Sequence, residues 1–117
     1  MKQAVCDADR LKPGQVMEVR LDRLSLVVVR GRDGGYRVLR NVCAHQGAPL
    51  SAGMLEPMIV ADAPGCYRIE AGKEVLRCPW HAYEYDIDTG RSPSDPARIR
   101  VKSYAVTVED GAVMVEL

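Results

Sequence analysis

Histidine, blocks of charge and long apolar runs are all scarce in this sequence. Its 117 residues include only two histidines, and sixteen basic residues balance sixteen acidic ones. No block of Lys and Arg is present that would bind nucleic acid or an anionic membrane through its charge. No apolar stretch is long enough to span a membrane, and the first residues have no apolar run typical of a secretory signal. We therefore expect a cytoplasmic protein that has neither nucleic acid nor a membrane as its partner.

Helical periodicity is also missing. Seven prolines and ten glycines are distributed along the chain and separate short stretches that alternate with period two. A length of 117 residues suits one domain, which we expect to span 1–117. Short strands with regular turn signals predict an all-β fold, a small antiparallel sandwich or barrel.

Two hairpins have the clearest signals. The run 25–30 is rich in β-branched residues, and a glycine-rich turn at 31–35 separates it from a returning strand at 36–40. Near the end, Asp110-Gly111 would join two strands: Lys102, Tyr104, Val106 and Val108 would share one face of the first, and Val113, Val115 and Leu117 one face of the second. Between them, 66–70 and 74–77 are expected as two short strands around a turn at 71–73.

Each of the two histidines lies close to a cysteine. Cys43-Ala44-His45 and Cys78-Pro79-Trp80-His81 each supply one thiol and one imidazole from a loop-forming segment. Four such ligands could hold a tetrahedral structural zinc, or a [2Fe-2S] cluster with two thiolates on one iron and two imidazoles on the other. Zinc ribbons usually pair like ligands as Cys-x2-Cys, so the mixed pairs favour the cluster and leave zinc as the alternative.

The residues around these pairs resemble the Rieske iron–sulfur family. The segments Cys43-Ala44-His45-Gln46-Gly47-Ala48-Pro49-Leu50 and Cys78-Pro79-Trp80-His81-Ala82-Tyr83-Glu84-Tyr85-Asp86 are similar to its ligand loops, best to those of soluble ferredoxins and oxygenase Rieske domains. The resemblance covers nearly the whole chain. It implies a Rieske-like fold in which two loops form a cluster-binding subdomain at about 42–90. It also implies one [2Fe-2S] cluster, with Cys43 and Cys78 on one iron and His45 and His81 on the other.

Two departures from the family pattern concern the loops and the segment between them. The segment 51–77 is longer than in many ferredoxin members, so we expect a surface insertion within it. Its apolar residues are expected to pack locally rather than to form a docking patch: Leu55, Met58, Ile59 and Val60. Ala82 stands where glycine is common after the second histidine, and it would be mildly strained if that position requires a positive φ.

Three aromatic residues are candidates for tuning the cluster: Trp80, Tyr83 and Tyr85. Respiratory members of the family join the two loops by a disulfide, whereas Ala48 and Trp80 occupy those positions here. High-potential relatives carry a serine hydroxyl where this chain has Tyr83, while Tyr85 matches a tyrosine position of the family and is expected to donate one hydrogen bond to a cysteine sulfur. Fewer donors stabilise the reduced cluster less, so we expect a low reduction potential. Trp80 is expected to anchor its loop in the core, and the alternative is that it stacks over the cluster loop and shields it from water.

The other two cysteines, Cys6 and Cys66, lie outside both loops. Disulfides rarely persist in a reducing compartment, so we expect two separate thiols that are at least partly buried, with a Cys6–Cys66 disulfide as the alternative.

The resemblance implies an electron-transfer protein without substrate chemistry of its own. Both histidines are used by the cluster, which excludes the mononuclear iron site of two histidines and one carboxylate. No Gly-x-Gly-x-x-Gly follows a strand. We therefore expect a soluble one-electron carrier between an NAD(P)H-dependent reductase and a terminal oxygenase. The alternatives are a small Rieske subunit of a larger enzyme, such as assimilatory nitrite reductase, and a zinc-bound structural or interaction module.

Charge is distributed unevenly along the chain. Residues 1–40 hold nine Lys/Arg and five Asp/Glu, whereas residues 41–90 hold three and seven. One hypothesis is therefore an acidic docking face for redox partners, steered by charge, that includes Glu56, Asp62, Glu84, Asp86 and Asp88. The alternative is that these carboxylates form an ordinary solvated surface.

Overall fold

The computed structural model describes residues 1–44, 47–79 and 83–117. Within these residues the chain forms ten strands and one short 3-10 helix, η1 (Leu50–Ala52), with no α-helix. The all-β prediction is thus confirmed. No helix in the described part of the chain is long and apolar enough to cross a membrane.

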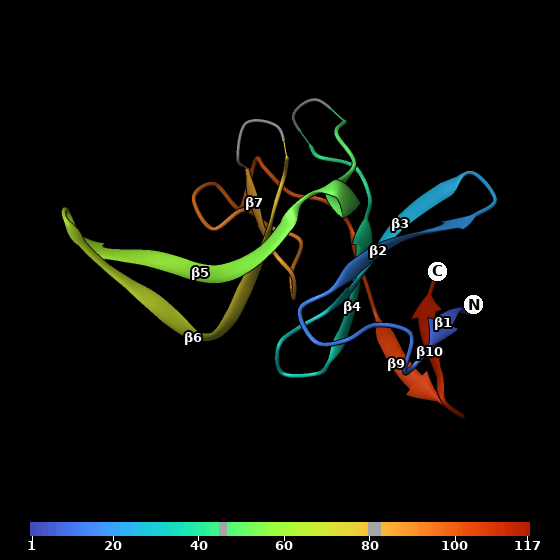
Figure 1. The fold of residues 1–117 in the computed structure, drawn as a ribbon. Helices are drawn as coiled ribbons and strands as arrows, with labels where there is room; N and C mark the ends of the chain where they lie inside the picture. Colours follow the sequence, from blue (N-terminus) through green and yellow to red (C-terminus); the bar gives the residue numbers. More distant parts are fainter. Residues whose placement is uncertain (45–46, 80–82) are drawn as a thin grey trace.

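The strands form three antiparallel sheets (Figure 1). The central sheet has the order β2 (Val16–Leu21), β3 (Leu24–Arg30), β4 (Tyr36–Arg40) and β8 (Ser103–Tyr104). A terminal sheet joins β1 (Lys2–Asp7), β10 (Ala112–Glu116) and β9 (Val106–Glu109). The third sheet consists of β5 (Met54–Ala63), β6 (Cys66–Arg77) and β7 (Glu84–Asp86).

Strand β3 is buried on both of its faces and divides the core in two. Its Val27 and Val29 side chains join the cluster of buried residues that includes Cys43, Cys78 and Tyr85. The alternate residues Leu26 and Val28 belong to a second cluster, which reaches Leu11, Val38 and Val115. Fully burying such a side chain stabilises the fold by about 1.5–3 kcal/mol. The first cluster therefore ties the two cysteines directly to the most buried strand of the protein.

The predicted hairpins at 25–40 and around Asp110-Gly111 are both present. Strands β3 and β4 pair from Leu26↔Arg40 to Arg30↔Tyr36. At the other turn, Glu109 pairs with Ala112, and the two residues between them have positive φ values of 51° and 74°. A two-residue turn with two left-handed residues matches the right-handed twist of the strands it joins.

The strand predicted at 102–108 is divided between two sheets. Ser103–Tyr104 (β8) pairs with β4, whereas Val106–Glu109 (β9) pairs with β10. The Ala105 carbonyl between them accepts a hydrogen bond from the Glu116 amide. The chain thus crosses from the central to the terminal sheet at Ala105, a change that period-two alternation does not reveal.

The two short strands predicted at 66–70 and 74–77 are one strand, β6. Its register with β5 runs Pro57↔Glu74 and then Ile59↔Ile69, so residues 70–73 lie opposite the single residue Met58. The expected turn at 71–73 is therefore part of a large bulge within one strand, in which Gly72 has φ +72°. The partner strand β5, which decides this outcome, was not predicted, and neither were β1 and β2.

Strands β5 and β6 extend well beyond the third strand of their sheet. Strand β7 pairs only with Val75, Leu76 and Arg77. The outer part is a two-stranded ribbon, residues 59–70, which we call the arm; Figure 1 shows it projecting from the body. Leu55 and Met58 at its base are buried as expected, but Ile59 is 60% exposed and Val60 is half-buried, so the prediction of local packing was wrong for Ile59.

Candidate functional site

The first predicted ligand loop begins directly after strand β4. Cys43 is 1% exposed, and its amide donates a hydrogen bond of 2.7 Å to the carbonyl of Ala48. The Gly47 amide donates to the Cys43 carbonyl at 3.0 Å, and Gly47 has φ +72°, which glycine adopts without strain. These bonds close the loop around a cysteine whose side chain lies in the core.

The second loop is closed in the same way. Cys78, also 1% exposed, follows β6 directly, and its amide donates to the carbonyl of Tyr83 at 2.7 Å. In both loops the cysteine amide therefore bonds to the carbonyl five positions later. His45, Trp80, His81 and Ala82 lie outside the described residues, so the structure does not test the predictions made for them.

Tyr85 on strand β7 connects the two loops. Its side chain is fully buried, and its hydroxyl lies 3.2 Å from the Cys43 sulfur. The same hydroxyl accepts a hydrogen bond from the Ala44 amide at 2.9 Å, which leaves its proton for the sulfur. Burial raises the pKa of the Tyr85 phenol well above its usual value, and the hydrogen bond to Cys43 raises it further. The phenol therefore keeps its proton at neutral pH and would donate it to the sulfur of Cys43 in the thiolate form.

Asn41 is a structural residue of the site that sequence reasoning missed. It is 3% exposed, and its side-chain oxygen accepts a hydrogen bond of 2.7 Å from the Ser51 amide. Its side-chain nitrogen donates to the hydroxyls of Ser51 at 3.0 Å and Ser25 at 3.1 Å. Asn41 precedes the first loop and Ser51 follows it, so these bonds hold the two ends of the loop together. No local signal in the sequence marks this role, because it depends on burial and on partners ten or more positions away.

Gly53 brings the chain after the first loop against the second. A Cβ atom at this position would collide with the carbonyl oxygen of Arg77, the residue that precedes Cys78. Gly53 also donates its amide to the Leu50 carbonyl at 2.9 Å. Only a residue without a side chain allows this close approach, which fixes the spacing between the two loops.

Most carboxylates of the predicted acidic face are paired with cations. Glu56 and Glu84 both lie on the Arg77 guanidinium, at 3.1 and 3.3 Å. Asp62 pairs with Arg68, and Asp88 pairs with Arg37 and Lys73. The Asp86 carboxylate accepts the amide of Asp88. These residues therefore do not form one continuous acidic surface, and the negative charge that is not neutralised is confined to small separate groups.

Tyr83 is half-buried beside the second loop and lines hollows on two sides. On one side lies a groove of about 600 Å³ that extends to the arm. On the other side lies a hollow of about 400 Å³, which also includes Ala44 of the first loop. Its bulky phenol thus occupies the surface where both loops meet the solvent.

The cysteines outside the loops form no disulfide. Cys6 is partly buried, and burial raises the pKa of its thiol. Cys66 is exposed at the end of the arm, so the expectation of partial burial was wrong for this residue.

The donors that the structure describes suit a thiolate-bound metal centre. Two buried sulfurs come from two loops closed in the same way, and a protonated phenol lies within hydrogen-bonding distance of one of them. Hydrogen bonds to the cysteine sulfurs are a normal feature of iron–sulfur sites and adjust their potentials. The arrangement therefore fits an iron–sulfur cluster.

Comparisons with curated proteins find relatives that match nearly the whole chain. It is 29% identical over 115 residues to the ferredoxin component of the naphthalene 1,2-dioxygenase system of Pseudomonas putida, covering 98% of this chain and 93% of that protein. It is also 29% identical to human apoptosis-inducing factor 3, again over 98% of this chain. The chain spans only 16% of the length of that relative.

Solved structures agree with the fold. The ferredoxin of Sphingomonas yanoikuyae B1 superposes with a TM-score of 0.74 at 29% identity, covering 100% of this chain and 99% of that chain. A small subunit of an NADH-dependent nitrite reductase from Mycobacterium tuberculosis gives a TM-score of 0.78 at 24% identity, covering 98% and 93%. At this lower identity the second similarity shows the fold alone.

A family model identifies the chain more directly. The model of the Rieske [2Fe-2S] domain matches residues 1–105, which include both cysteine loops, every strand of the central and third sheets, and Tyr85. The chain therefore belongs to the Rieske [2Fe-2S] domain family, whose cofactor is one [2Fe-2S] cluster.

Proposed function

We propose that the protein is a one-electron carrier whose cluster is held by Cys43 and Cys78 on one iron and by His45 and His81 on the other. The burial of both cysteines in loops with the same closing hydrogen bond is the observation that supports it most. The cluster supplies the ability to accept and release one electron. The protein contributes the rest: Tyr85 donates toward Cys43, and Asn41 and Gly53 set the positions of the loops.

We further propose that the carrier takes electrons from an NAD(P)H-dependent reductase and passes them to a terminal oxygenase. The support is the similarity to the ferredoxin component of a dioxygenase system, which extends over most of both chains. On this proposal residues 1–117 act as one Rieske domain in the cytoplasm, with a cluster-binding part at about 42–90.

The second candidate is a small Rieske subunit of a nitrite reductase. Its support is the similarity of fold to such a subunit, with a TM-score of 0.78. The two candidates differ in their partner. A carrier would be reduced by a separate reductase and would reoxidise on adding an oxygenase, whereas a subunit would copurify with a large catalytic chain at fixed stoichiometry.

Loss of a ligand tests the cluster assignment. We expect Cys78→Ser and His45→Ala to purify without the visible chromophore and without the rhombic EPR signal of the reduced cluster, because neither replacement restores the lost donor. Cys6→Ser and Cys66→Ser are the matched controls and should keep both signals, since these residues lie outside the loops. A full-strength Rieske spectrum in either ligand variant would refute the assignment.

Metal analysis of the same samples tests the zinc alternative. A structural zinc module would be colourless and would contain zinc without iron or sulfide. We expect iron and acid-labile sulfide in equal amounts, in agreement with the family to which the chain belongs.

A further inference from the structure

The arm exposes an apolar face that nothing in the described protein covers. Its register pairs Ile59 with Ile69 and Ala61 with Tyr67, so these four side chains share one face of the ribbon. Ile59, Tyr67 and Ile69 are 60%, 71% and 65% exposed. A two-stranded ribbon has little core of its own and is marginally stable in water. A concentration of apolar residues here is therefore not explained by folding.

The opposite face of the arm carries ion-paired side chains and one half-buried apolar residue, Val60, which pairs with Arg68. Arg68 donates to Asp62 and to Glu70 at 2.9 and 2.6 Å. The ribbon is thus amphipathic, because all of its ion pairs lie on one face and its exposed large apolar side chains lie on the other. Exposed apolar surface with a polar boundary commonly marks an interaction site.

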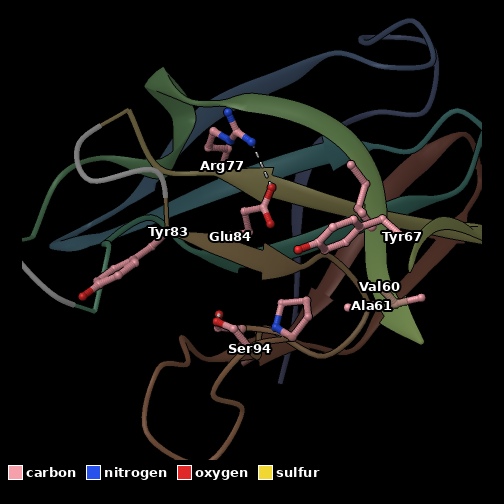
Figure 2. A pocket seen from close by; sticks show the side chains of 10 residues that line it. Val60, Ala61, Tyr67, Arg77, Tyr83, Glu84 and Ser94 are labelled. Atoms are coloured by element: carbon pink, nitrogen blue, oxygen red, sulfur yellow. Dashed lines mark hydrogen bonds and ion pairs between the residues drawn. The ribbon is translucent and has the colours of Figure 1, made fainter. Parts of the chain in front are cut away.

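Part of the apolar face forms one wall of the groove beside the second cysteine loop. Ile59, Ala61 and Tyr67 line it from the arm, and Arg77, Tyr83 and Glu84 line it from the body. Figure 2 shows Tyr67 and Val60 on the arm, with Glu84 and Arg77 joined by an ion pair and Tyr83 at the far end. The groove therefore leads from the arm to the loop that carries Cys78.

The charge of this region favours a cationic occupant. Arg77 is shared by the carboxylates of Glu56 and Glu84, and Arg68 is shared by those of Asp62 and Glu70. Each of these two groups, one arginine with its two carboxylates, therefore has one more negative than positive charge. Such local potential steers positively charged partners, while the aromatic rings of Tyr67 and Tyr83 can also attract a cation.

We propose that the arm and the groove form a docking site for a redox partner protein that inserts an apolar projection carrying a lysine or arginine side chain. The apolar face of the arm would cover the projection, and the two acidic groups would select its charge. This proposal rests on the proposed function, because it assigns the partner of the same electron carrier.

Small redox reagents of opposite charge test the site in the full protein. The dithionite-reduced protein, freed of reductant, is mixed in a stopped-flow instrument with tris(1,10-phenanthroline)cobalt(III), a cation with apolar aromatic ligands. One electron leaves the reduced protein and converts cobalt(III) to cobalt(II). Hexacyanoferrate(III) is an anion that also takes one electron from the reduced protein, and it serves as the second oxidant.

Variants of the arm and of the groove should slow the cationic oxidant alone. Tyr67→Ser with Ile59→Ser should slow oxidation by the cobalt complex about fivefold or more, because anchoring side chains in such sites commonly contribute over 1 kcal/mol. Glu56→Gln with Glu84→Gln should slow it and also weaken its dependence on salt. Oxidation by hexacyanoferrate(III) should not slow in either variant.

Val108→Ser, which removes a 55% exposed valine from β9, and Glu116→Gln in β10 are the matched controls and should leave both rates unchanged.

Each other outcome has a defined meaning. The docking site would be overturned if the cobalt complex oxidised the arm variants as fast as the controls. It would also be overturned if the arm variants were slowed equally with both oxidants. Concentration-dependent dimers in sedimentation that Tyr67→Ser abolishes would also overturn it, because a second copy would then cover the arm. Absence of a reducible chromophore in the unmodified protein would instead overturn the proposed function.

Discussion

At the scale of single residues, Tyr85 is the described side chain that donates toward a proposed ligand, the Cys43 sulfur. It approaches the Cys43 sulfur at 3.2 Å from a fully buried position. Reduction adds negative charge to the sulfurs, so a donor at this distance stabilises the reduced form more than the oxidised form. The sequence suggested such a bond, but only the structure identifies Cys43 as its acceptor.

We expect Tyr85→Phe to keep the chromophore and to lower the midpoint potential. A difference of about 1 kcal/mol in the strength of one hydrogen bond between the two redox states corresponds to roughly 40 mV for a single electron. A redox titration followed in the visible range measures it. The control is Tyr36→Phe, whose hydroxyl donates to the Ala8 carbonyl at 2.8 Å, away from the loops, and should leave the potential unchanged. An unchanged potential in Tyr85→Phe would show that the bond does not distinguish the redox states.

The absolute potential should lie in the lower half of the Rieske range. That range runs from about −150 to +300 mV. Ala48 is buried where a disulfide-forming cysteine would stand in high-potential relatives, and Tyr83 places a bulky phenol where those relatives have a small hydroxyl. A midpoint above roughly +200 mV in the same titration would contradict this reasoning.

At the scale of elements, the two cysteine loops depend on each other through one glycine. Gly53 follows η1, which ends the first loop region, and lies against the Arg77 carbonyl just before the second loop. The sequence could not show this contact, because it joins segments that are distant along the chain. Asn41 was missed for the same reason, since its partners Ser25 and Ser51 lie ten or more positions away.

We expect Gly53→Ala to destabilise the site by separating the loops. Overpacking against a rigid backbone atom costs about 1–3 kcal/mol. Thermal unfolding should shift to lower temperature, and the cluster absorbance should fade faster on dilution into chelator. Gly72→Ala is the control, because Gly72 has a positive φ of 72° but no neighbour within 4 Å, so it should cost stability without affecting cluster retention. Equal retention in both variants would show that the Gly53 contact does not set the spacing of the loops.

At the scale of the whole molecule, the sequence predicted the parts that depend on local signals. The β3–β4 hairpin and the Asp110-Gly111 turn follow from β-branched runs and turn residues, the short strands with regular turn signals predicted the all-β class, and the resemblance of the two loops implied its Rieske-like form. The course of β5 and β6 was not predictable in this way. Whether Ala71-Gly72-Lys73 forms a hairpin turn or a bulge depends on the partner strand, which contains Pro57 and few β-branched residues.

The arm is the part of the molecule that we expect to be dispensable for the fold. All buried core residues of its sheet lie outside residues 59–74, among them Leu55, Met58, Val75 and Leu76. Replacing residues 59–72 by Asn-Gly would join Met58 to Lys73 next to the existing Pro57↔Glu74 pair, with a turn suited to two-residue hairpins. The shortened protein should therefore keep its spectrum and its midpoint potential, and its melting temperature should change little.

Its reaction with tris(1,10-phenanthroline)cobalt(III) should slow at least as much as that of Tyr67→Ser with Ile59→Ser, while hexacyanoferrate(III) reacts as before. This combination separates an arm that binds partners from one that supports the fold. Loss of the chromophore on shortening would show instead that the arm stabilises the cysteine loops. In that case its exposed apolar face would need a structural explanation, which the burial of the described residues does not offer.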